Sequence, residues 1–237
     1  MPTITLDSYF QGPTGSGQGG WTSALLAREC EGSATIAIRA PIPLETEMWT
    51  EHKNGKVDLV YASGDTPVVV LEAEPWEPHF PDTAPVSIDE AGEARSRFPF
   101  GPDDHPVPYC FSCGLQHDSM CVHAWSIADG RYATDWTPPA RFDIGDGTVD
   151  HAAVWAAVDC TAAWYACTAG GTRVAFTVQL AVEVLEPIRI GETYALVGWE
   201  GDGVAEWDGR KRTAASAAFD RNGNCVARSR SLWVSVN

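Results

Sequence analysis

An apolar stretch in the middle of the chain, residues 147–171, contains Asp150, His151 and Asp159. Its composition predicts a helix, and residues four apart on a helix share one face, so His151, Trp155 and Asp159 would form a stripe. A carboxyl group flanked by Trp and Ala side chains is partly desolvated, which raises its pKa and makes it a better general base. Asp159 is therefore a candidate base for activating water. The simpler interpretations are an ordinary helix carboxylate and, for His151, a side chain that hydrogen-bonds the preceding loop.

Cysteine and histidine also gather between residues 110 and 123. Cys110 and Cys113 form a CxxC pair, and His117, Cys121 and His123 follow closely. A structural zinc site normally takes four ligands from two well-spaced pairs. The second pair here would crowd the first, so we expect a tight turn and no metal. The seven cysteines are an odd number, and several lie in apolar segments, which favours free thiols in a reducing compartment.

The formal net charge of −16 predicts a surface that repels nucleic acid and anionic membranes unless a local basic patch overrides it. Six of the 16 basic residues nevertheless lie within 21 positions: Arg210, Lys211, Arg212, Arg221, Arg228 and Arg230. They could decorate a solvent-facing sheet edge or bind an anionic ligand. No apolar run approaches the roughly 18 residues of a membrane span, and the first residues lack the features of a signal peptide. We therefore expect a cytoplasmic protein.

The elements that must position these side chains occur twice. Residues 75–108 hold eight of the 16 prolines and are predicted to form a linker over the surface. On each side of it the pattern predicts one strand, one helix (residues 19–30 and 147–171) and about four further strands, the third of the second set spanning residues 203–220. This is an internal duplication, with domains at 1–74 and 109–237.

A helix as apolar as 147–171 must be buried on nearly every side. An antiparallel sheet curled around each helix provides that burial. The expected fold class is therefore α+β, a double hotdog in which two repeats form a pseudo-dimer within one chain.

Two motifs carry a resemblance to a known family. His151-Ala152-Ala153 followed by Asp159 keeps the spacing of a His-Gly-Gly signature with an acid eight positions after the His, so the second half resembles hotdog-fold thioesterases. Cys110-Phe-Ser-Cys113-Gly114 resembles the Cys-Phe-x-Cys-Gly opening of many single-hotdog members. The duplicated layout resembles the two-hotdog acyl-CoA thioesterases of the thioesterase II type.

That resemblance implies site residues. The family trio is an Asp on the second helix, a Thr on the next strand and a Gln near the C-terminus, which correspond to Asp159, Thr177 and the position of Ser231. Ser231 departs from the pattern, because serine is shorter than glutamine. Trp155 would contact substrate or simply lie in the core.

Thioester hydrolysis also needs donors for the developing oxyanion, and the amides that begin a helix are unpaired. We expect those of Ala152 and Ala153 to serve, although the two alanines replace the family's glycines and leave substrate less room. In the first half, Gln18-Gly19-Gly20 keeps the glycines, but Leu26 stands where the acid should be. That half is expected to be non-catalytic and to lend its Gly-rich helix start to the interface.

The resemblance implies an acyl-CoA thioesterase that needs no cofactor and takes an acyl-CoA or other acyl thioester as substrate. Arg210, Lys211 and Arg212 would meet the CoA phosphates, and an apolar tunnel between the halves would hold the acyl chain. The alternatives are an acyl-binding protein without turnover, and a dehydratase or hydratase that pairs His151 with Asp159. A homo-oligomer is possible. The deciding observation is whether an enclosed cavity ends at the Asp159 carboxylate.

Overall fold

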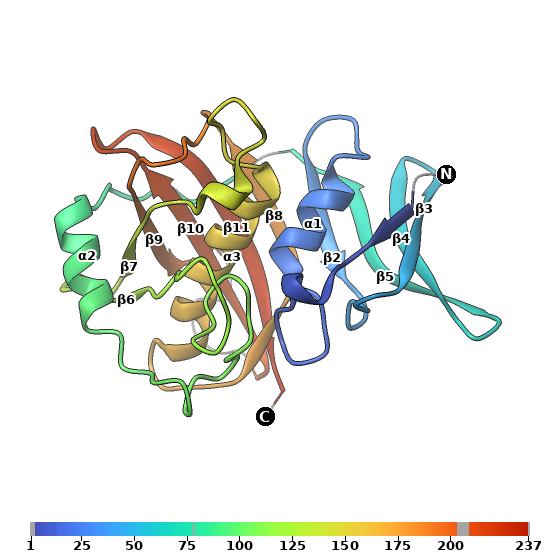
Figure 1. Cartoon of the computed structure of the whole chain (residues 1–237), viewed down its shortest axis with the longest axis horizontal. Helices are drawn as coiled ribbons and strands as arrows, with labels where there is room; N and C mark the ends of the chain where they lie inside the picture. The colour runs from blue at the N-terminus through green and yellow to red at the C-terminus, as the bar shows by residue number, and fades with distance from the viewer. Residues whose placement is uncertain (1–2, 78, 203–208, 237) are drawn as a thin grey trace.

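The computed structural model describes residues 3–77, 79–202 and 209–236 and shows the predicted duplication directly (Figure 1). One antiparallel sheet runs through the molecule in the order β1-β3-β4-β5-β2-β8-β11-β10-β9-β7-β6. The first repeat contains β1 (Thr3–Thr5), α1 (Gly19–Ala27), β2 (Ala34–Ile38), β3 (Glu47–Lys53), β4 (Lys56–Ser63) and β5 (Thr66–Pro75). The second contains β6 (Trp125–Ser126), β7 (Tyr132–Trp136), α3 (His151–Thr168), β8 (Ala175–Val184), β9 (Tyr194–Glu200), β10 (Lys211–Phe219) and β11 (Cys225–Ser235). Short 3-10 turns, η1 (Ser8–Phe10) and η2 (Ala140–Phe142), precede α1 and α3.

The strand order relates the two repeats. From edge to seam the first repeat reads β1-β3-β4-β5-β2 and the second reads β7-β9-β10-β11-β8, with β6 added outside β7. In each repeat the helix follows the outermost of these five strands along the chain. At the seam β2 pairs antiparallel with β8, through Ile36–Leu180 and Ala37–Gln179. The predicted α+β double hotdog is confirmed.

The central helix α3 is shorter than the predicted 147–171. Asp150 caps its start by accepting a hydrogen bond from the Ala152 amide (2.7 Å), and Gly170 and Gly171, both with positive φ, follow its end. Every residue of α3 except His151, Ala163 and Cys167 is buried, as its uniformly apolar composition requires. Helices α1 and α3 lie beside each other on one face of the sheet (Figure 1).

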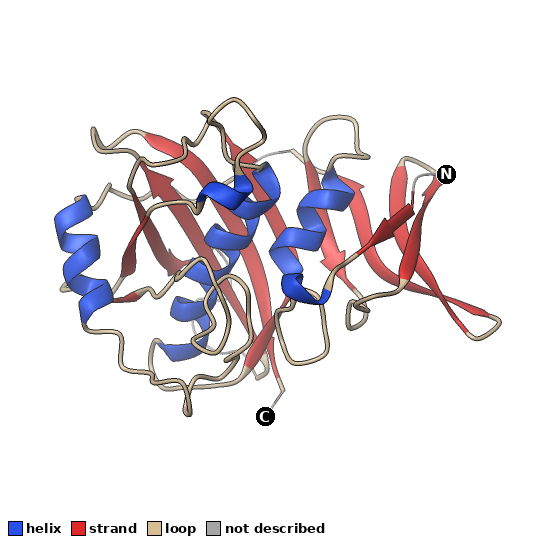
Figure 2. Cartoon of the chain, in the orientation of Figure 1, coloured by secondary structure: helices blue, strands red, loops and turns tan. Residues whose placement is uncertain are grey.

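The proline-rich segment does more than cross the surface. It contains the nine-residue helix α2 (Ile88–Ser96), capped by Ser87 and seen beside the second repeat in Figure 2. Ala91 and Ala94 of α2 pack on Val197 and on other apolar side chains that the second repeat presents away from α3. Alternate residues of β9 thus face two different helices, which explains why nearly all of β9 is buried. Of the strand predicted at 203–220, β10 covers Lys211–Phe219, and 203–208 lie outside the described residues.

Candidate active site

Asp159 is the centre of a hydrogen-bonded group that spans both repeats. It lies at the middle of α3, and the residue is 3% exposed. Thr177 of β8 donates from Oγ1 to Asp159 Oδ1 (2.8 Å). The Gln18 amide, at the start of α1, donates from Nε2 to Asp159 Oδ2 (2.8 Å), and the Gly20 backbone N–H donates to the same oxygen (3.2 Å). One repeat therefore supplies the acid and its threonine, and the other supplies the helix start.

The start of α1 is built for this contact. Gln18 caps the helix, because its Oε1 accepts a hydrogen bond from the Trp21 amide (2.6 Å). That bond fixes the amide so that its NH2 group points at the carboxyl of Asp159. Gly20 allows the two helices to approach: a Cβ there would lie 2.7 Å from the Trp155 carbonyl oxygen and 2.8 Å from Asp159 Cβ. A side chain at position 20 would therefore push α1 away from the acid.

The surroundings of Asp159 suit a base that works near neutral pH. Burial raises the pKa of this carboxyl to about 7, although the hydrogen bonds from Thr177, Gly20 and Gln18 each lower it. The positive end of the α1 dipole faces the carboxylate as well. The group can therefore both accept and return a proton at physiological pH.

The carboxyl of Asp159 borders a cavity of about 530 Å³ between the repeats, a volume typical of small-ligand sites. The lining is mostly apolar and includes Ile38, Ile42, Trp164, Phe176, Val178 and Trp233. Gln18, Gly19 and Thr177 line it beside Asp159, and Arg39 and Arg173 contribute cationic side chains. A second hollow of about 400 Å³ lies near Tyr9, Trp21, Arg141 and Asp150, away from this group.

The expectation that Asp159 faces the amides of its own helix start is wrong. The Ala152 amide donates to Asp150 Oδ1 and the Ala153 amide to the Asp150 carbonyl oxygen (2.9 Å). Eight residues of helix span about 12 Å, so these groups cannot reach Asp159. Ala152 and Ala153 are fully buried, while His151 is exposed.

The other members of the predicted stripe also lie away from the cavity. Trp155 is buried in the core and, like His151, does not line the cavity in the part of the chain that the structure describes. Its carbonyl oxygen faces Gly20 instead. Of the predicted stripe on α3, the structure therefore places Asp159 alone at the cavity.

Ser231 does not take the place of the family's glutamine. Its hydroxyl donates to the Ala214 carbonyl oxygen (3.1 Å) and accepts from Trp233 Nε1 (2.8 Å). In the pairing of β11 with β8, Ser231 lies opposite Leu180, and Trp233 lies opposite Thr177 after a register shift between Leu232 and Trp233. The side-chain amide at the acid comes from Gln18 instead. The sequence predicted that this helix start would belong to the interface, but not that the Gln18 side chain would contact Asp159.

The basic cluster is also placed differently from the prediction. Arg212 is 5% exposed, and its guanidinium donates to the carbonyl oxygens of Ala166 (3.1 Å) and Ala169 (2.7 Å) at the end of α3. Arg210 donates to the Ser235 carbonyl oxygen (2.8 Å), and Lys211 is exposed. None of the three lines the cavity among the residues described. Arg212 therefore satisfies carbonyl oxygens at the C-terminal end of α3, and its guanidinium is not available to bind a phosphate.

No protein-family model matches the chain, and no curated protein matches its sequence. Among helices in the described ranges, none has the length and apolar character to cross a membrane. Among the solved structures that match are two that cover nearly the whole chain. The tesB protein of Mycobacterium avium subsp. paratuberculosis is 12% identical, with 99% of this chain and 92% of that chain covered and a TM-score of 0.57.

The second structure is a conserved protein of unknown function with a hot dog fold from Alicyclobacillus acidocaldarius. It is 15% identical, with the same coverage and a TM-score of 0.52. The PaaI protein of Escherichia coli matches 48% of the chain and 78% of its own length, at 17% identity and a TM-score of 0.41. The two matches over nearly the whole chain show a hotdog fold, and the strand order shows that it is present twice.

Proposed function

We propose that this protein hydrolyses an acyl thioester, with acyl-CoA as the substrate class and Asp159 as the general base. One observation carries the proposal. A buried carboxyl group, held by Thr177 on one side and by the start of α1 on the other, lies at the wall of a cavity. A base, a hydroxyl and the amides of a helix start at one point are what hydrolysis of an acyl bond requires.

The cavity suits an acyl-CoA. Its apolar lining would hold the acyl group, while the cations Arg39 and Arg173 would meet phosphate groups. Arg39 is also paired with Glu72 (2.8 Å). These cations matter because the whole chain carries a net charge of −16 and would otherwise repel an anionic substrate.

The hydrogen bonds at Asp159 leave room for one water molecule. A carboxylate has about four acceptor sites. Thr177 occupies one on Oδ1, and Gln18 and Gly20 occupy two on Oδ2. A water bound to the remaining site on Oδ1 would lie next to the Thr177 hydroxyl, which would orient it.

In the reaction, this water attacks the thioester carbonyl carbon and gives its proton to Asp159. The carbonyl oxygen becomes negative and accepts a hydrogen bond from the first turn of α1. The Gly20 N–H makes the longest of the three bonds to Asp159 and is the donor most readily passed to the substrate. The C–S bond then breaks, and the departing thiolate takes the proton from Asp159, which leaves a carboxylic acid product and a free thiol.

The dehydratase alternative paired His151 with Asp159. His151 is exposed and lies outside the cavity lining, so the geometry does not support that mechanism. An acyl-binding protein without turnover remains the alternative that experiment must distinguish.

The test measures thiol release from short, long and aromatic acyl-CoAs. We expect turnover with at least one of them and a decrease in kcat of about 1,000-fold in Asp159→Asn, within the range of general-base catalysis. His151→Ala, on the same helix but outside the cavity, should retain the wild-type rate. Tight binding of an acyl-CoA with no thiol release from the wild type would refute hydrolysis and establish a binding protein.

A further inference from the structure

Three of the seven cysteines meet beside the cavity. The sulfur atoms of Cys110, Cys113 and Cys160 all lie within 4.8 Å of one another, and those of Cys110 and Cys160 are 4.0 Å apart. All three residues are buried, and all three line the cavity. Two come from the turn that opens the second repeat, and the third comes from α3, immediately after Asp159.

The turn that carries Cys110 and Cys113 is tightly fixed. The Gly114 amide donates to the Cys110 carbonyl oxygen (2.6 Å), and a Cβ at position 114 would lie 2.6 Å from that oxygen. Glycine is therefore required at this position. His123 Nε2 lies 3.1 Å from the Cys113 carbonyl oxygen and holds the turn from the other side.

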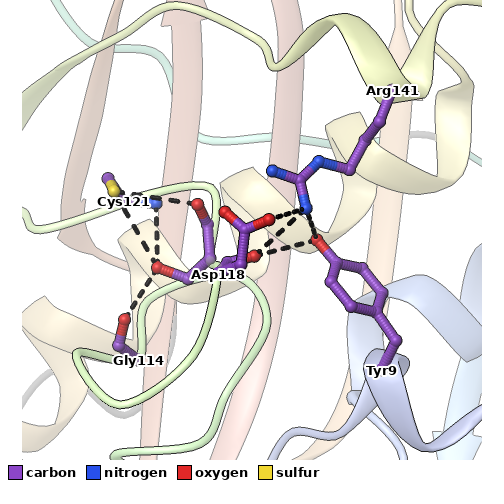
Figure 3. Close-up of polar contacts among 6 residues, drawn as sticks. Tyr9, Gly114, Asp118, Cys121 and Arg141 are labelled. Atoms are coloured by element: carbon purple, nitrogen blue, oxygen red, sulfur yellow. Dashed lines mark hydrogen bonds and ion pairs between the residues drawn. The ribbon is translucent and has the colours of Figure 1, made fainter.

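The loop that follows the turn is anchored to the first repeat. Arg141 donates to the Asp118 carboxylate (2.6 Å) and to the Tyr9 hydroxyl (2.8 Å), while Ser119 donates to the Gly114 carbonyl oxygen (2.7 Å) (Figure 3). The two sulfur atoms of the turn are thus held in place before any ligand binds.

The three side chains offer a donor set that a soft cation prefers. Cysteine sulfur atoms select zinc and similar thiolate-binding metals over magnesium or calcium, and here three of them lie together in one buried group.

We infer that Cys110, Cys113 and Cys160 bind a thiolate-preferring d¹⁰ cation, with Zn²⁺ as the occupant. At a Zn–S distance of about 2.3 Å in a tetrahedral site, sulfur atoms lie about 3.8 Å apart. The observed separations require shifts of less than about 1 Å to reach that value. Binding exchanges the thiol protons for the cation and leaves a fourth position that a donor from the cavity can fill.

A second ligand pair for zinc, close to Cys110 and Cys113 in the sequence, could come from among His117, Cys121 and His123. Those residues do not belong to this sulfur group, because α3 supplies the third ligand from 47 positions along the chain. The inference stands on the sulfur geometry and does not depend on thioester hydrolysis.

The test uses the full chain, reduced and stripped of metal. We expect one Zn²⁺ per chain in competition with a chromogenic chelator, and an ultraviolet cadmium–thiolate charge-transfer band when Cd²⁺ is added. In Cys160→Ala and Cys113→Ser the affinity for Zn²⁺ should fall at least about tenfold. Cys225→Ser, a half-buried cysteine on β11 outside the sulfur group, is the matched control and should bind as the wild type does.

A measurement on the unmodified protein keeps the inference testable if a variant does not fold. Zn²⁺ should protect Cys110, Cys113 and Cys160 from alkylation and leave the labelling of exposed Cys121 unchanged, as read by peptide mass spectrometry. The absence of a cadmium–thiolate band in the reduced wild type would overturn the inference. So would a Cys160→Ala variant that folds and keeps the full affinity for Zn²⁺.

Discussion

The interface between the repeats contains the candidate site and a pseudo-symmetric counterpart, and the two differ at each position that matters. In the candidate site, Gln18-Gly19-Gly20 of α1 faces Asp159 of α3. The equivalent residues of the counterpart are His151-Ala152-Ala153 of α3 and Leu26 of α1, and Leu26 is completely buried. Near the counterpart, Arg28 forms an ion pair with Asp150.

The comparison explains the two departures from the family pattern, the missing acid of the first repeat and the missing glycines of the second. Taken repeat by repeat, each half looks damaged: the first lacks the acid, and the second lacks the glycines. Each site, however, takes its helix start from one repeat and its acid position from the other. Both defects therefore fall in the counterpart, and the candidate site keeps its acid and its glycines.

Substitution of Gly20 should show the difference between the candidate site and its counterpart most clearly. Gly20→Ala should lower kcat/KM at least about 100-fold, because the new Cβ would lie 2.7 Å from the Trp155 carbonyl oxygen and force α1 away from Asp159. Ala153→Gly makes the reverse change at the counterpart and should leave the rate unchanged. Equal effects of the two substitutions on steady-state thioester hydrolysis would show that the sites are not distinct.

Thr177 should give the next largest effect. Thr177→Val removes the hydroxyl that donates to Asp159 Oδ1 and should lower kcat about 10- to 100-fold, the equivalent of a hydrogen bond to a charged group. Thr177→Ser keeps the hydroxyl and should retain most of the rate. If the valine variant hydrolyses acyl-CoA as fast as the serine variant, Thr177 has no part in catalysis.

Substitution of Arg212 should change the stability of the fold and not the hydrolytic rate. Arg212→Ala leaves the carbonyl oxygens of Ala166 and Ala169 without this donor and should lower the free energy of unfolding by about 2–3 kcal/mol. Urea denaturation followed by circular dichroism measures the change. Lys211→Ala, at the exposed neighbour, should change it by less than about 0.5 kcal/mol. A loss of CoA affinity in Lys211→Ala would restore the basic cluster as a substrate contact.

Arg173 should give the smallest effect. Arg173→Ala is expected to raise the KM for an acyl-CoA about threefold and to leave kcat unchanged, since the side chain lines the cavity but is not one of the groups bonded to Asp159. The effect should shrink as ionic strength rises. An unchanged KM at low salt would remove Arg173 from the substrate contacts.

Much of the arrangement could be predicted from local pattern. The apolar helix, the alternating strands and the proline-rich segment predict the duplicated fold, because each depends on residues close in the chain. The same holds for the burial of Asp159, which follows from its neighbours on α3. Its contact with Thr177 required the family resemblance as well.

The missed features depend on contacts between distant residues. The bond from Gln18 to Asp159 joins residues 141 positions apart and exists only because α1 packs across α3. The register that sets Ser231 opposite Leu180, and not opposite Thr177, has no sequence signal either. Arg212 lies in a charged run that predicts a solvent-exposed side chain, yet it is buried against the end of α3.

The covalent connection between β5 and β7 has an evolutionary consequence. An assembly of two identical single repeats would carry every substitution in both copies, so losing an acid or a glycine would damage both of its sites at once. Joining the repeats in one polypeptide lets each copy mutate separately. One catalytic centre can then decay without harm to the other, and the positions it releases become free to serve packing alone.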